Sequence, residues 1–164
     1  MSIKDEIEKL ISAEQTKLEN RDKKHAKYHE RQRFRFKPLR VVLEKIAASV
    51  DSKYLELIFN SDSATLELGR IEGSSRSTDT RWRIEPNCDF NFRAEAGESL
   101  FYEEPGIKVG ETEYYRYSDG DAPQDTKIFK NEQALSEYLV KKISERVAHY
   151  RHSESIAVKR TEGE

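Results

Sequence analysis

Residues 21–40 of this 164-residue chain are RDKKHAKYHERQRFRFKPLR, and this stretch joins a helical N-terminal segment to the rest of the protein. It contains nine Lys or Arg residues against only Asp22 and Glu30. Residues 1–20 carry a net charge of −2 and residues 41–164 carry −7, so the formal net charge of −2 hides a strong asymmetry. Such segregation indicates a binding partner or self-association, the alternative being that the basic and acidic parts neutralise each other.

One long helix is predicted for residues 3–33, because no Pro or Gly occurs before Pro38. Its apolar side chains recur at helical spacing and form one stripe, which His25, Tyr28 and His29 prolong. Glu14 and Arg21 interrupt this stripe, so antiparallel pairing or docking of the first turns is favoured over a long parallel coiled coil. Such a helix spans about 45 Å and would overhang a body about 35 Å across. The apolar members of the stripe are Ile3, Ile7, Leu10, Ile11 and Leu18.

The dipeptide Lys37–Pro38 predicts a break in this helix. A residue before proline avoids the α region, and proline suits the first turn of a new helix. A short second helix is therefore expected from Pro38 to about residue 48. Phe34 and Phe36 are expected to anchor the corner to the body.

From residue 53 the apolar period changes from 3.6 to 2, which predicts strands. The alternation favours an antiparallel meander of five or six strands, with a polar loop over residues 73–79. The expected strands cover residues 53–59, 64–71, 80–85, 88–94, 98–103 and 111–117, with a short edge strand at 127–129.

A C-terminal helix is predicted from Asn131, a good N-cap, to about His152. Its stripe of Leu135, Leu139, Val140, Ile143, Val147 and Tyr150 would be buried. The predicted fold is α+β and two-layer, with the N-terminal long helix, the short second helix and the C-terminal helix packed on one face of the meander. The predicted parts are an N-terminal helical arm (1–33), an α+β body (34–152) and a flexible tail (153–164).

A basic face opposite the packing stripe is the candidate contact surface. Such cations suit an acidic protein partner, and next to the RFRF motif they also suit phosphates and stacked bases. No known nucleic-acid-binding motif accompanies them. We therefore expect a protein partner or self-association first and nucleic acid second. The candidate partner-binding residues are Lys23, Lys24, Lys27, Arg31 and Arg35.

Two pairs of histidines are candidates for functional sites. His25 and His29 extend the packing stripe, so we expect pH-sensitive packing that protonation weakens. His149 and His152 have a spacing that could share a metal, but no nearby cysteine joins either pair. We assign no metal, no cofactor and no catalytic residue.

The single cysteine, Cys88, excludes an internal disulfide and suits a reducing compartment. No segment approaches the roughly 20 apolar residues of a membrane span. The sequence thus favours a cytoplasmic, non-enzymatic interaction protein of adaptor, regulator or inhibitor type. The alternatives are a nucleic-acid-binding protein that uses the basic arm and a small nuclease-like enzyme.

Overall fold

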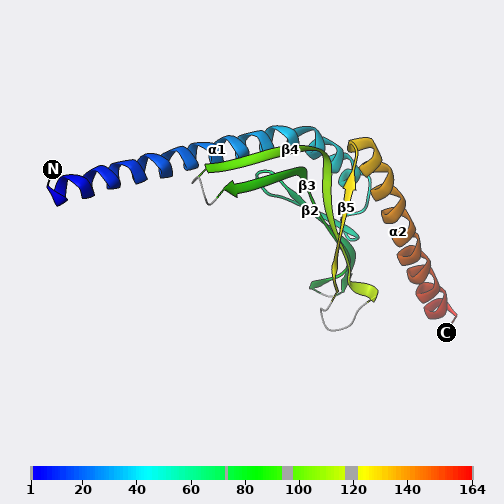
Figure 1. Ribbon diagram of the computed structural model, residues 1–164. Coiled ribbons are helices and arrows are strands. Elements are labelled where there is room, and N and C mark those ends of the chain that lie inside the picture. The colour runs from blue at the N-terminus through cyan, green and yellow to red at the C-terminus, as the bar shows by residue number, and fades with distance from the viewer. Residues whose placement is uncertain (1, 73, 94–97, 117–121, 164) are drawn as a thin grey trace.

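The computed structural model describes residues 2–72, 74–93, 98–116 and 122–163, with the backbone alone for residues 72, 88–93, 98–105 and 116. In these ranges the chain is α+β, with a long N-terminal helix, a five-stranded antiparallel sheet and a C-terminal helix (Figure 1). The elements are α1 (Ile3–Ala48), β1 (Leu55–Phe59), β2 (Ala64–Glu72), β3 (Ser75–Arg93), β4 (Glu98–Glu113), the 3-10 helix η1 (Tyr114–Arg116), β5 (Gln124–Phe129) and α2 (Glu132–Glu162).

Helix α1 does not break at Pro38. The predicted corner and the predicted short second helix are wrong, because one helix of 46 residues runs through both. Proline cannot donate to the Phe34 carbonyl, but Pro38 lies on the exposed side of α1, where water can reach that oxygen. Phe36 and Leu39 are buried on either side of Pro38 and pack both halves of α1 against the same core. The boundary predicted at residue 33 therefore falls inside a helix.

The expected antiparallel meander is confirmed, with five strands in the order β1-β2-β3-β4-β5. The strands expected at 80–85 and 88–94 belong to one strand, β3, whose pairing with β4 shifts register between Pro86 and Cys88. Most of the loop expected at 73–79 also belongs to β3, because residues from Ser75 onward pair with β2. The strands expected at 98–103 and 111–117 also belong to one strand, β4, which ends at Glu113, where η1 follows.

Core residues of the sheet lie directly opposite one another on neighbouring strands. The register places Leu57, Leu66, Trp82 and Glu111 in one row across β1 to β4. Both helices contribute to the same core, through Phe36, Leu39, Leu43 and Ile46 of α1 and Leu135, Leu139, Ile143, Val147 and Tyr150 of α2. Val140, which was expected in the buried stripe of α2, is instead about half exposed. Helix α2 also continues to Glu162, so residues 153–162 of the expected tail are helical.

A carboxylate inside the core links both long strands to α2. Glu111 is only 5% exposed. Its Oε2 accepts a hydrogen bond from Trp82 Nε1 at 2.7 Å and a second, short one from the Tyr138 hydroxyl. Burial and this contact with Glu111 raise the pKa of Tyr138 well above its usual range, so the hydroxyl stays a donor. Because a buried carboxylate is unfavourable without hydrogen bonds, these two donors are required for Glu111 to lie there.

A second polar link ties α2 to β3. Asp79 Oδ2 accepts from Arg146 Nη2 at 2.9 Å and from the Tyr150 hydroxyl through a short hydrogen bond. Burial, followed by the hydrogen bond to Asp79, raises the pKa of Tyr150 to about 12. Tyr150 also stacks on Tyr54 of the segment before β1, with ring centroids 5.6 Å apart. Helix α2 is thus held in place by directional contacts as well as by its apolar stripe.

The Glu111 contacts predict a large loss of stability on truncation. Glu111→Ala leaves the buried Trp82 Nε1 and the half-buried Tyr138 hydroxyl without this acceptor, and we expect the free energy of unfolding to fall by about 2–4 kcal/mol. Glu44→Ala is the matched control, because Glu44 is an exposed member of an ion pair with Arg40, and it should change stability by less than about 1 kcal/mol. Urea unfolding monitored by tryptophan fluorescence measures both. Equal effects of the two substitutions would contradict the role given to Glu111.

The raised pKa of Tyr150 predicts a pH dependence with a defined sign. Folding favours the protonated hydroxyl, so its contribution is complete below the unfolded pKa of about 10 and is lost as pH rises toward about 12. The stability advantage of the wild-type chain over Tyr150→Phe should therefore be constant up to about pH 10 and shrink above it. Unfolding curves of both chains at several pH values test this. An advantage that grows above pH 10 would show the opposite linkage.

Candidate partner-binding surface

The outer face of α1 carries an exposed aromatic ring surrounded by cations. Phe34 is 72% exposed, whereas Phe36, two residues further along the helix, is 2% exposed. Residues two positions apart in an α-helix differ by about 200° around the helix axis. Because Phe36 enters the core, Phe34 must face solvent. Lys27, Arg31, Arg33 and Lys37 join Phe34 and Glu30 around an open hollow of about 650 Å³. We call Lys27, Arg31, Arg33, Phe34 and Lys37 the outer basic surface.

Positive charge dominates the outer basic surface. Four cationic side chains and one carboxylate, Glu30, line the hollow. The Lys37 ammonium lies 5.9 Å from the centroid of the Phe34 ring, within the range of a cation–π contact. An exposed Phe between cations offers an apolar contact and a positive field at one place. This combination suits a ligand that has both acidic and apolar groups.

Three of the five predicted contact residues lie where a partner can reach them. Lys23, Lys27 and Arg31 are exposed on α1, whereas Lys24 is half-buried. Lys27 and Arg31 belong to the outer basic surface, and Lys23 precedes it by one turn. The structure thus brings part of the predicted face together with residues that were not predicted.

Arg35, the fifth predicted contact residue, holds α1 on the sheet. Its Nη1 donates to the Asn87 carbonyl at 2.8 Å and to Gln32 Oε1 at 3.4 Å, and its Nη2 donates to the Gly106 carbonyl at 3.5 Å. Gln32 in turn donates to the Pro86 carbonyl at 3.2 Å. The register shift between Pro86 and Cys88 leaves Asn87 outside the β3–β4 pairing, so a side chain can take up its carbonyl. Arg35 therefore has a structural role in this fold.

The two histidines on α1 have different surroundings. His25 is half-buried, whereas His29 is exposed and its Nδ1 lies 3.7 Å from Asp62 Oδ2 in the turn between β1 and β2. The pH-sensitive packing of His25 and His29 stays a prediction.

Arg33, Phe34 and Lys37 were missed as contact residues because a helix break was expected after Arg33. The helical wheel itself would have identified them. When it is continued through Pro38, Phe34 and Lys37 fall on the face opposite to Phe36 and Leu39. Phe34 was expected to anchor a corner, and its exposure corrects that expectation.

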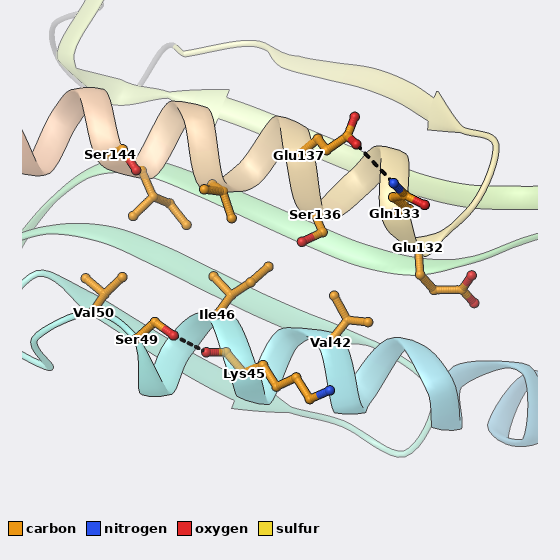
Figure 2. A pocket seen from close by; sticks show the side chains of 12 residues that line it. Val42, Lys45, Ile46, Ser49, Val50, Glu132, Gln133, Ser136, Glu137 and Ser144 are labelled. Atoms are coloured by element: carbon orange, nitrogen blue, oxygen red, sulfur yellow. Dashed lines mark hydrogen bonds between the residues drawn. The ribbon is translucent and has the colours of Figure 1, made fainter.

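A second concave feature lies between the two helices. Figure 2 shows Val42, Ile46 and Val50 of α1 and the loop after it pointing toward α2. This groove has a volume of about 630 Å³, and Val140 and Ile143 complete its apolar lining from α2. Its polar rim contains Lys45, Glu132, Gln133 and Glu137. The groove is therefore apolar with mixed charge at its edge, unlike the outer basic surface.

A smaller hollow beside α2 is lined by a histidine and two glutamates among other residues. It has a volume of about 200 Å³ and brings His149 together with Glu113 and Glu145. Both of its basic side chains form ion pairs with carboxylates. Lys142 Nζ lies 3.4 Å from Glu113 Oε1, and Arg146 Nη2 lies 2.9 Å from Asp79 Oδ2. These ion pairs account for the positions of Lys142 and Arg146 in the hollow.

The remaining described residues provide no metal centre or membrane segment. Across them, no three His, Cys, Asp or Glu side chains are grouped so that they could hold a metal ion. In the same part of the chain, neither helix has an apolar stretch long enough to cross a membrane. The Cys88 side chain and residues 117–121 lie outside the described residues. No family model, curated protein or solved structure matches this chain.

The contacts of Arg35 predict a contrast between two neighbouring arginines. Arg35→Ala removes hydrogen bonds to the Asn87 and Gly106 carbonyls and should lower the free energy of unfolding by about 1–3 kcal/mol. Arg33→Ala, on the exposed face of the same turn, should change it by less than about 0.5 kcal/mol. Urea unfolding of the two variants measures the contrast. If Arg33→Ala were the more damaging change, Arg35 would not be the residue that holds α1 on the sheet.

Proposed function

We propose that this chain is a non-enzymatic interaction protein whose outer basic surface binds an acidic segment of a protein partner. The observation that carries the proposal is Phe34, which is 72% exposed in the middle of four cations. Large exposed aromatic side chains are unfavourable in water and are enriched where proteins contact one another. The cations would supply attraction and orientation, and Phe34 would supply the buried anchor.

A protein partner is favoured over nucleic acid by what surrounds the outer basic surface. Residues 41–164 carry a net charge of −7, so most of the body would repel phosphates. The groove of Figure 2 has a mainly apolar lining, and Lys45, Glu132 and Glu137 are among its polar lining residues, which suits a polypeptide. We infer that the partner is a protein, and we place the complex in the cytoplasm because the single cysteine suits a reducing compartment.

Nucleic acid is the second candidate, and Phe34 is also what supports it. An exposed aromatic ring beside the four cations of the outer basic surface could stack a base while the cations contact phosphates. Four such contacts would give a logarithmic salt slope of about −3 for a single strand. The two candidates therefore differ in what the surface captures and in how steeply capture depends on salt.

Capture from a cell lysate, with and without nuclease, tests the proposal. The full chain should retain a protein that nuclease does not remove. Lys27→Glu/Arg31→Glu/Lys37→Glu should lose it, because the field of the surface is reversed, and Phe34→Ala should weaken capture by about tenfold or more. The matched control is Lys141→Glu/Lys159→Glu/Arg160→Glu on α2, which makes the same charge change at exposed positions and should leave capture intact.

Two results would contradict a protein partner at this surface. One is capture that survives the triple change on α1. The other is capture that nuclease abolishes, together with binding of a labelled single-stranded oligonucleotide that falls with the salt slope given above. The second result would support the nucleic-acid candidate.

A further inference from the structure

The first five turns of α1 project beyond the sheet with an apolar stripe in solvent. Figure 1 shows this end of the helix extending past the strands. Every residue from 3 to 20 is exposed, and the first half-buried residue is Arg21. We call residues 3–20 the overhang. Its five apolar stripe residues, Ile3, Ile7, Leu10, Ile11 and Leu18, are between 42% and 76% exposed.

The overhang cannot cover its stripe within its own molecule. Helix α1 is continuous from Ile3 to Ala48, so the overhang cannot fold back. At 1.5 Å per residue, Ile3 lies about 60 Å along the axis from Val42, the nearest residue of the apolar groove in Figure 2. Among the described residues nothing covers the stripe, so another chain can pack on it.

We propose that the overhang pairs with the overhang of a second copy of this chain, antiparallel, about a two-fold axis between residues 11 and 12. On the helical wheel, Glu6 and Lys17 lie on one flank of the stripe and Lys4 and Glu19 on the other. In an antiparallel pair each flank meets the same flank of the partner. This axis sets Glu6 level with Lys17 of the partner subunit, and Lys4 level with Glu19 of the partner subunit. All four flank positions thus meet opposite charge.

The apolar side chains interlock in the same register. Leu18 of the partner subunit is level with residue 5, between Ile3 and Ile7. Leu10 and Ile11 lie next to the axis and meet their own copies. The five stripe residues of each overhang therefore become covered together.

A parallel pair is disfavoured by the same charges. In parallel register Glu14, which lies within the stripe, would face its own copy. The two stretches of residues 21–40, each with a net charge of +7, would also run side by side. The antiparallel pair instead places the two bodies at opposite ends. It leaves the outer basic surface, which begins at Lys27, outside the contact.

The pairing should be weak and concentration-dependent, because its length is limited. From Arg21 onward, the face that continues the stripe is half-buried at Arg21, His25 and Tyr28 in the chain's own fold. Only residues 3–20 are thus free to pair. An interface of two helices this short falls at the small end of specific protein contacts.

Sedimentation equilibrium of the full chain, from about 1 µM to about 1 mM, tests the pairing. The wild-type chain should pass from monomer to dimer in this range. Leu10→Lys/Ile11→Lys should raise the dissociation constant at least about tenfold without changing urea unfolding of the body, because both residues lie outside the core. The control is Val41→Lys, a half-exposed apolar residue elsewhere on α1, which should dimerise normally.

Direction and register are tested by charge exchange and disulfide trapping. Glu6→Lys and Lys17→Glu should each weaken the dimer, and the double variant should restore it. In a Cys88→Ser background, Ile11→Cys should cross-link between copies on oxidation. Ile3→Cys should not, because the antiparallel pair separates its two copies by about 26 Å along the axis.

A chain that stays monomeric up to about 1 mM would overturn the proposal, as would dimers that Leu10→Lys/Ile11→Lys leaves intact. Ready cross-linking of Ile3→Cys would also overturn it, since it indicates a parallel pair. The outer basic surface lies outside the contact, so loss of pairing with retained partner capture would contradict this inference alone.

Discussion

The continuity of α1 through Pro38 is the constraint on which the rest of the structure depends. A proline inside a helix costs about 3 kcal/mol. Burial of Phe36, Leu39 and Leu43 contributes about 1.5–3 kcal/mol for each side chain, so packing on both sides outweighs the local penalty. Because the helix is unbroken, the three core residues set the rotation of the whole rod. Their orientation directs Phe34 and Lys37 to solvent and places the overhang beyond the sheet.

Directional contacts then determine how the two helices sit on the strands. Apolar burial has no preferred direction, whereas hydrogen bonds do. Arg35 joins α1 to the carbonyls of Asn87 and Gly106, at the place where the pairing of β3 and β4 shifts. Glu111 joins Trp82 to Tyr138 and so links β3, β4 and α2. These contacts fix the positions of α1 and α2 on the strands, and with them the positions of the outer basic surface and the apolar groove.

Much of the secondary structure followed from local pattern. The stripe through Leu135, Leu139 and Ile143 predicted α2, and period-2 alternation predicted most of the sheet. The joining of two expected strands into β3 did not follow, because a bulge at Pro86–Cys88 lets pairing continue where proline suggested an end. In the candidate site, the helical wheel predicted the exposure of Lys23, Lys27 and Arg31 correctly. It did not predict that Arg35 holds α1 on the sheet or that Phe34 is exposed, because both features depend on the unbroken helix.

By itself the sequence determined the features that depend on neighbours in the chain. These are the periods of the helices and strands, the Asn131 cap, and the concentration of positive charge in residues 21–40. Only the tertiary structure decided which polar groups are buried and which aromatic ring is exposed. Glu111 meets donors 29 and 27 residues away, and Arg35 meets a carbonyl 52 residues away. Such pairings depend on strand register and helix rotation, which are set by the packing of the whole core.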